Sequence, residues 1–189
     1  MDTVFSSNAL EGYSYSLSET RILREDGLTA GGKPLRDAFA VVGLGRAYDY
    51  MFSLLHHVGI TEHDVVHLHE MLHGSLENDA LAGAYRQTPA FISGSRYPVS
   101  RPEDIESRMR GLLARVSEER ETLHPLVAAA RFHKEFVFIH PFSDGNGRIA
   151  RLVPLAGHPA SRFAGQGAFE RLKNRQQFYA SKGESHVTS

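Results

Sequence analysis

The residue types best suited to chemistry in this chain are gathered between His140 and Arg151. An imidazole with an ordinary pKa of about 6.5 can take a proton from a hydroxyl group near neutral pH, which makes His140 a candidate base. Gly145 and Gly147 let main-chain N–H groups converge on an anion, because neither residue carries a Cβ that would block its approach. If a helix begins near Asn146, the positive end of its dipole adds to that attraction.

The same segment supplies a hard oxygen ligand and two cations. The carboxylate of Asp144 is a ligand that Mg²⁺ accepts while the ion also holds phosphate oxygens and water. Arg148 and Arg151 are three positions apart on the expected helix, so both can reach the same bound phosphates. Together these groups indicate phosphoryl or nucleotidyl transfer. The alternative from the residues alone is an ordinary turn, since Gly-Asn-Gly and Asp-Gly are common turn sequences.

This segment resembles the signature of the Fic family, His-x-Phe-x-(Asp/Glu)-Gly-Asn-Gly-Arg-x-x-Arg, and it meets every fixed position. The preceding helix is similar to that of the family at Ala129, His133, Phe136, Ile139 and His140. The resemblance implies an all-α fold, a Fic-type helical bundle with a small β-hairpin flap. It extends from about residue 5 to residue 153 and is strongest over 133–151.

The resemblance implies a role for each position of the motif. His140 would deprotonate the target hydroxyl, Phe142 would be buried under the loop and hold it in place, and Asp144 would bind Mg²⁺. The anion hole and the contacts to the nucleotide phosphates would come from Gly145, Asn146, Gly147, Arg148 and Arg151.

The activity that the resemblance implies is transfer of AMP from ATP to a Tyr, Thr or Ser hydroxyl of a target protein, the chain itself included. ATP would be the substrate and Mg²⁺ the cofactor. Kinase-type relatives carry lysine where this chain has Gly147, so glycine there favours AMP transfer over phosphate transfer. The alternatives are another nucleotide or phosphate donor, and a catalytically impaired binding module. The expected partners are ATP and a protein substrate, with no nucleic acid and no membrane, and a homodimer is left open.

A second motif lies near the N-terminus. Ser7, Glu11 and Gly12 match the inhibitory pattern of one branch of the family, (Ser/Thr)-x-x-x-Glu-(Gly/Asn). Within an inhibitory segment of about residues 1–20, the Glu11 carboxylate would pair with Arg151 and occupy the arginine that orients the donor phosphates. The alternative is an ordinary helix start, since Ser-x-x-x-Glu occurs often by chance.

A rival reading comes from His69-Glu70-Met71-Leu72-His73, which satisfies the His-Glu-x-x-His pattern of zinc metalloproteases. On a helix the two histidines share a face and can bind Zn²⁺, with Glu70 as the base. No Gly-x-x-His continuation follows, and the chain has 11 histidines, so a chance match is not rare. This function is therefore the least favoured of the alternatives.

Composition narrows the class of protein. The chain has 21 Lys and Arg against 22 Asp and Glu, a balance that favours neither a nucleic-acid surface nor an acidic tail. It has no cysteine, which excludes thiolate chemistry and Cys-based zinc sites. The first residues are neither basic nor followed by an apolar stretch, so we expect no signal peptide and a cytoplasmic location.

The elements around the motifs are read from periodicity and capping. Apolar residues at helical spacing predict helices over 35–58, from about Thr61 to a stop at Gly74, from Pro102 through Val116 and over 125–138. Gly83, Pro89, Gly94 and Pro98 punctuate the stretch from Leu81 to Ser100, which suits a small β-hairpin or an extended loop. Residues 85–98 would be the flap and 140–151 the catalytic loop with the helix start, all within a single domain over 1–189. Pro154 lacks the N–H of an inner helical turn, so the last helix is expected to be short and poorly buttressed.

Overall fold

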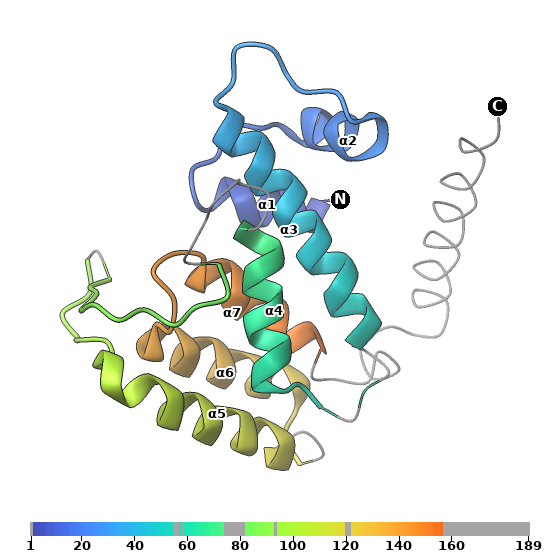
Figure 1. Ribbon diagram of the computed structural model, residues 1–189. Helices are drawn as coiled ribbons and strands as arrows, with labels where there is room; N and C mark the ends of the chain where they lie inside the picture. Colours follow the sequence, from blue (N-terminus) through green and yellow to red (C-terminus); the bar gives the residue numbers. More distant parts are fainter. Residues whose placement is uncertain are drawn as a thin grey trace. The chain divides into compact units, whose positions relative to one another are not determined.

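Helices make up the regular structure of the described part of the chain (Figure 1). The computed structural model describes residues 2–54, 57, 59–73, 82–92, 94–119 and 122–156. The described part contains α1 (Asp2–Ala9), α2 (Leu17–Asp26), α3 (Leu35–Ser53), α4 (Glu62–His73), the short 3₁₀ helix η2 (Pro102–Asp104), α5 (Ile105–Glu119), α6 (Pro125–Ile139) and α7 (Asn146–Ala156). All of it belongs to one unit, residues 1–157. The rest of the expected single domain over 1–189 lies outside the described residues.

The helices begin and end where the side chains allow. Ser16 caps α2: its hydroxyl accepts the Glu19 N–H, and the Glu19 carboxylate accepts the Ser16 N–H at 2.8 Å. Gly27 ends the same helix in a left-handed conformation that costs glycine little. Pro125 begins α6 behind the N-cap residue His124. These local signals fix the ends of the helices independently of the core.

The core is built around α3, which packs against α1, α2, α4 and α7, while α6 packs between α5 and α7. A Cβ at Gly43 would lie 2.2 Å from the Leu72 carbonyl oxygen, so only glycine permits the close approach of α3 to α4. The fully buried core side chains include Val41, Leu44, Met51, Val65, Leu68, Met109, Phe136, Phe142 and Ile149. Helix α7, which carries the second half of the motif, is therefore anchored in the main core.

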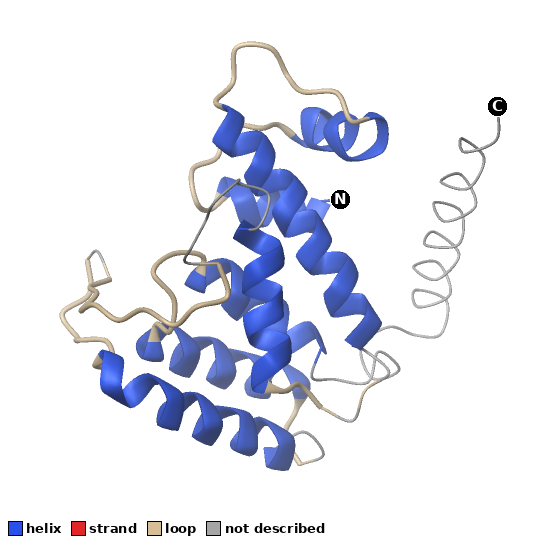
Figure 2. Cartoon of the chain, viewed as in Figure 1, coloured by secondary structure: helices blue, strands red, loops and turns tan. Residues whose placement is uncertain are grey.

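The all-α prediction is confirmed, but the hairpin part of the flap prediction is wrong for the described residues. No strand is assigned among residues 82–92 and 94–100, which form an extended loop (Figure 2). Pro89 and Pro98 lack the N–H groups that a two-stranded ladder needs. Instead, the loop bonds to its neighbours, for example through the Ser100 N–H, which donates to the Phe138 carbonyl at 3.0 Å. Ser93 lies outside the described residues.

The prediction of a short, poorly buttressed last helix is also wrong as far as residue 156. Helix α7 continues through Pro154 to Ala156, and Ile149, Ala150, Leu152 and Val153 are buried. Proline leaves the carbonyl four positions earlier, that of Ala150, without its usual helical donor. His133 on α6 fills that place, since its Nδ1–H donates to the Ala150 oxygen at 3.3 Å. The neighbouring helix thus compensates for the proline.

Two boundaries differ from the predicted ones. Helix α3 ends at Ser53 with Leu54 as its C-cap, earlier than the predicted end at residue 58. Residues 55, 56 and 58, and the predicted stop at Gly74, lie outside the described residues. No helix in the described ranges is long and apolar enough to span a bilayer.

Candidate active site

His140 stands at the point where α6 turns into the catalytic loop. It is the C-cap residue of α6 and has φ 53° and ψ 58°, the left-handed region that residues other than glycine rarely adopt. Its N–H donates to the Phe136 carbonyl at 2.8 Å. The ring Nδ1 lies 3.2 Å from the Val137 carbonyl oxygen and must donate to it, because a carbonyl only accepts. The other ring nitrogen, Nε2, then carries the lone pair that a base requires.

The surroundings of His140 keep it neutral. Burial lowers the pKa of the imidazole below its ordinary value, the bond to the Val137 carbonyl opposes that change, and the positive charge of Arg86 adds to it. Asp144 has a weaker effect in the raising direction. A neutral imidazole is the form that accepts a proton, so the site is suited to general-base chemistry.

The loop after His140 is held by Phe142 and Asn146. The Asn146 side chain accepts the Phe142 N–H at 3.0 Å and donates to the Phe142 carbonyl at 2.7 Å. The Phe142 ring is fully buried, as the resemblance implied, and it stacks on His69 with the centroids 3.8 Å apart. The side chain of Asn146 is therefore committed to the loop itself, and only its main chain can contribute to the anion hole.

His69 belongs to the support of this loop and not to a zinc site. Its Nδ1 accepts the Gly83 N–H at 2.9 Å, and its Nε2 donates to the Asp144 carbonyl at 3.1 Å. Both nitrogens are thus used by main-chain groups, and Glu70 is paired with His67 at 2.8 Å. No cluster of three metal-ligating side chains occurs in the part of the chain that the structure describes. The spacing of the two histidines in His-Glu-x-x-His suggested a metal, and no feature of the sequence suggested this supporting role.

Two glycines shape the predicted anion hole. Gly145 has φ 75°, and a Cβ there would lie 2.8 Å from atoms of Leu72 and His73. A Cβ at Gly147 would lie 2.9 Å from the Glu11 carboxylate oxygen. A carboxylate therefore already lies beside the first turn of α7, where the free N–H groups and the helix dipole attract an anion.

Arg148 is a buried cation, and one of its donors is unpaired in the structure. Its guanidinium is 3% exposed, Nη2 donates to the Asp144 carboxylate at 3.1 Å, and the group lies 5.4 Å from the centroid of the Tyr13 ring. Its Nε is buried and has no hydrogen-bond partner in the structure. A buried donor without a partner costs stability. Asp144 itself is exposed, at 69% of its side chain.

Arg151 is held by the N-terminal motif, as the inhibitory pattern implied. Its Nη2 donates to the Glu11 carboxylate at 2.7 Å and to the Ser7 carbonyl at 3.2 Å, and its Nε donates to the Ser7 hydroxyl at 3.0 Å. Glu11 lies two residues after the end of α1, and Gly12, with φ 81°, turns the chain so that Tyr13 also lines the cavity beside Arg148. The glycine of the motif is therefore needed for its positive φ.

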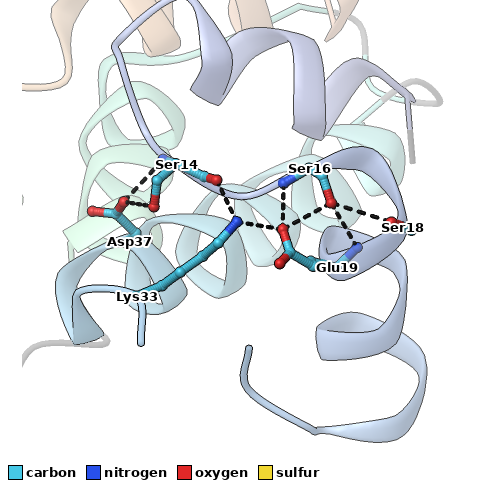
Figure 3. A network of polar contacts seen from close by, with 6 residues as sticks. All are labelled: Ser14, Ser16, Ser18, Glu19, Lys33 and Asp37. Carbon is cyan, nitrogen blue, oxygen red and sulfur yellow. Dashed lines mark hydrogen bonds and ion pairs between the residues drawn. The ribbon is translucent and has the colours of Figure 1, made fainter. Parts of the chain in front are cut away.

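A polar network fixes the chain just after this turn (Figure 3). The Asp37 carboxylate on α3 accepts the Ser14 N–H at 2.9 Å and the Ser14 hydroxyl at 2.5 Å. Lys33 donates to the Ser14 carbonyl and to Glu19 of α2. We call these residues, Ser14, Ser16, Glu19, Lys33 and Asp37, the anchor network. It ties the inhibitory segment to α2 and α3.

A cavity of about 370 Å³ opens between the inhibitory segment and the catalytic loop. Its lining combines apolar side chains with both signs of charge: Glu11, Gly12, Tyr13, Arg36, Phe39, Ala40, Leu72, His73, Asp144 and Arg148. Apolar walls suit a nucleobase, and the two arginines of the lining, Arg36 and Arg148, suit phosphate groups. Tyr13, Arg36 and Phe39 were not singled out from the sequence, because they come from the region where the motifs are weakest.

Known proteins resemble this chain over the same region. The family model described as Fic/DOC family matches residues 59–155. The protein adenylyltransferase Fic of Nematostella vectensis is 38% identical over 153 residues, which cover 79% of this chain and 35% of that protein. The protein adenylyltransferase fic-1 of Caenorhabditis elegans is 34% identical over 154 residues, which cover 79% of this chain and 30% of that protein. The chain thus spans about a third of the length of these curated relatives.

Solved structures agree with the sequence comparisons. A Fic-1 structure from C. elegans, residues 134 to 508, superposes with a TM-score of 0.73 at 32% identity and covers 81% of this chain and 46% of that one. A Fic domain containing signaling protein from Bacteroides thetaiotaomicron gives a TM-score of 0.71 at 26% identity, with 79% and 59% covered. With the motif, the fold and the arrangement of the loop in agreement, this chain belongs to the Fic/DOC family.

Proposed function

We propose that this chain transfers AMP from ATP to a hydroxyl side chain of a protein, and that Glu11 holds the activity in check. The observation that carries the proposal is the arrangement of the motif: His140 ends α6, Asp144 and Arg148 line one cavity with Glu11, and Arg148 and Arg151 lie in the first turns of α7. The names of the related proteins, protein adenylyltransferases, support AMP as the transferred group. Gly147, where kinase-type relatives have lysine, supports it further.

In this mechanism the target hydroxyl attacks the α-phosphate of ATP, and pyrophosphate leaves. The Nε2 of His140 takes the hydroxyl proton, since Nδ1 is bound to the Val137 carbonyl. The main-chain N–H groups of Gly145–Gly147 and the guanidinium of Arg148 stabilise the negative charge that grows on the phosphate oxygens. Arg151 would orient the terminal phosphates once it is released from Glu11.

The residues of the site also fit a magnesium ion. Asp144 is a single exposed carboxylate, hydrogen-bonded to Arg148, at the edge of the cavity. Mg²⁺ characteristically binds through one or two carboxylates together with the phosphates of its nucleotide. Asp144 would hold the ion, which would neutralise part of the phosphate charge.

The brake works by occupying groups that the nucleotide needs. The Glu11 carboxylate pairs with Arg151 and lies against Gly147, so it stands where a phosphate oxygen would bind. The pair is partly exposed, with 28% of the Arg151 and 36% of the Glu11 side chain accessible. A pair of this kind contributes about 1 kcal/mol or less, so the brake is weak enough to be released.

The test is transfer of label from α-labelled ATP in the presence of Mg²⁺. We expect Glu11→Gly to raise labelling of the chain or of added proteins above the level of the unchanged chain, and Glu11→Gly/His140→Ala to abolish it. A parallel reaction with γ-labelled ATP separates AMP transfer from phosphate transfer, because only a kinase would transfer the γ label.

The matched control is Leu10→Gly, which adds the same main-chain freedom one residue earlier at a side chain that is 72% exposed. It should leave labelling at the unchanged level. Labelling from γ-labelled ATP would show that the chain transfers phosphate, as a kinase does, and not AMP. No labelling by folded Glu11→Gly, from either position, would contradict the proposed function.

A further inference from the structure

Arg86, in the loop after α4, is a buried cation whose partners are main-chain carbonyls. Its side chain is among the largest that are fully enclosed, and the residue is 2% exposed. Nε donates to the His140 carbonyl at 2.7 Å and Nη1 to the Thr88 carbonyl at 2.7 Å. Nη2 donates to the carbonyls of Ser100 and Ile139. One guanidinium thus links both ends of the flap loop to the end of α6.

The main chain of the same loop reinforces this link. The Arg86 N–H donates to the Pro141 carbonyl at 2.9 Å, next to the residue whose carbonyl the side chain binds. The Ser100 N–H donates to the Phe138 carbonyl at 3.0 Å. The carbonyl groups of residues 138 to 141 are therefore all bound from the flap loop, through Arg86 and Ser100.

This position is where the chain most needs support. His140 is the one residue other than glycine with a positive φ in the described part of the chain. Such a conformation is unfavourable and persists only where the surroundings impose it. The last carbonyls of a helix also lack helical donors, and a cation there interacts well with the helix dipole. Arg86 supplies both the donors and the charge.

We propose that Arg86 is a positioning residue that holds the main chain of His140 in its left-handed conformation and so aims the imidazole into the site. The role of His140 as the base rests on the proposed function. All three guanidinium nitrogens point in fixed directions to different carbonyls, and a lysine ammonium cannot reproduce that fork. The flap loop therefore does more than border the site.

Charge supports this assignment. The groups that act on His140 electrostatically are Arg86 and Asp144: the first lowers the pKa of the imidazole and the second raises it. A conformational support that also carries a positive charge would both aim the base and keep it neutral.

The test uses Arg86→Lys and Arg86→Gln in the Glu11→Gly chain. A catalytic group misplaced by about 1 Å can lose roughly 100-fold in rate, and we expect a fall in kcat of that order for both variants, with the KM for ATP unchanged. The exposed Arg101, which follows the loop, provides the control Arg101→Lys, which should keep both constants.

Nuclear magnetic resonance of His140 supplies a readout that needs no activity. In both variants the Cα and Cβ shifts of His140 should move away from left-handed values, and its pKa should rise in Arg86→Gln but stay closer to the unchanged value in Arg86→Lys. If the parent transfers no AMP, the proposed function fails and these shifts alone decide the role of Arg86. Unchanged kcat and shifts would overturn it. Failure of both variants to fold would also overturn it, since Arg86 would then support the core as a whole.

Discussion

At the level of single residues, the Glu11 carboxylate lies where we propose that a nucleotide phosphate binds. Glu11 lies beside Gly147 at the first turn of α7 and is bound by the arginine that a nucleotide would use. Gly147 leaves space for the Glu11 carboxylate, and it would leave the same space for a phosphate, because a side chain at this position would displace either group. The arrangement explains why an inhibitory carboxylate and the glycine of the motif belong together.

Gly147→Ala should therefore uncouple Glu11 from Arg151. The new Cβ would lie 2.9 Å from the Glu11 oxygen, and we expect loss of about 1 kcal/mol of unfolding free energy with Glu11 present and less with Glu11→Gly. Urea unfolding of the four combinations measures this difference, in which the helix propensity of alanine cancels.

Gly111→Ala on α5 is the control, since its Cβ would meet nothing closer than 3.5 Å. It should stabilise the chain by about 0.5–1 kcal/mol whether or not Glu11 is present. Equal effects of Gly147→Ala in both backgrounds would show that the carboxylate does not press on residue 147.

The protonation of His140 gives a second expectation. Burial lowers the pKa of the imidazole below its ordinary 6.5, and only the neutral form accepts the hydroxyl proton. AMP transfer by the Glu11→Gly chain should thus stay constant as the pH falls from 8 to the ordinary value and decline only below it. The profile of kcat/KM against pH measures the midpoint. A midpoint at or above the ordinary value would contradict the assignment of His140 as a buried base.

At the level of elements, the end of α7 depends on its neighbour. Pro154 removes the donor for the Ala150 carbonyl, and His133 replaces it from α6. Both residues were noted in the sequence, the proline as a helix breaker and the histidine as part of the family pattern. Their connection could not be predicted, because it requires knowing that α6 lies alongside α7.

A double-mutant cycle tests this connection. We expect His133→Phe to cost about 1–3 kcal/mol in the presence of Pro154, because the Ala150 carbonyl loses its donor. In Pro154→Ala the cost should be much smaller, since the main-chain N–H of residue 154 can then donate. Thermal or urea unfolding of the four chains measures the coupling. Identical costs in both backgrounds would mean that His133 acts only by packing.

Most of the helices and the motif residues could be predicted, because they depend on local signals. Periodicity and Pro125 placed α6 to within one residue, and the fixed spacing of the motif identified His140 through Arg151. The supporting roles of His69 and Arg86 could not be predicted. Their partners are main-chain groups distant in sequence, and no side-chain pattern records such contacts. The flap hairpin was expected from family resemblance, whereas the prolines of this chain favour a loop.

At the level of the whole molecule, the anchor network is one of the two sets of contacts that hold the N-terminal segment, the other being those of Arg151. Burial by itself raises the pKa of Asp37, but the hydrogen bonds from Ser14 outweigh it and the pKa is lowered. The hydrogen bonds from Lys33 and Ser16 lower the pKa of Glu19 to about 2. Both carboxylates therefore favour the folded chain when they are ionised.

The sign of the pH dependence follows from these directions. Both groups have depressed folded pKa values, so their stabilisation is complete above the unfolded values, 3.8 for Asp37 and 4.5 for Glu19. For Glu19 it is lost as the pH falls from there toward about 2, and for Asp37 it is lost as the pH falls through the lowered folded pKa. We expect Asp37→Asn to destabilise the chain at pH 7 and to make its stability less dependent on pH between 5 and 3, as measured by urea unfolding.

The exposed Asp49, paired with Arg24 at 3.0 Å, provides the matched control. Asp49→Asn should change the unfolding free energy at pH 7 by less than about 1 kcal/mol. A pH dependence of Asp37→Asn that runs parallel to that of the unchanged chain would contradict the role of Asp37.

The shared use of Arg151 has a thermodynamic consequence. If Glu11 and a nucleotide compete for that arginine, their equilibria are linked, and each weakens the other by the same factor. A partner that draws residues 7–13 away from α7 would lower the nucleotide concentration needed for binding. By the same reciprocity, a rising nucleotide concentration would weaken the attachment of α1 and make α1 more accessible to a protease or a binding partner. The attachment of the N-terminal helix would then respond to the nucleotide concentration as well as inhibit the transfer.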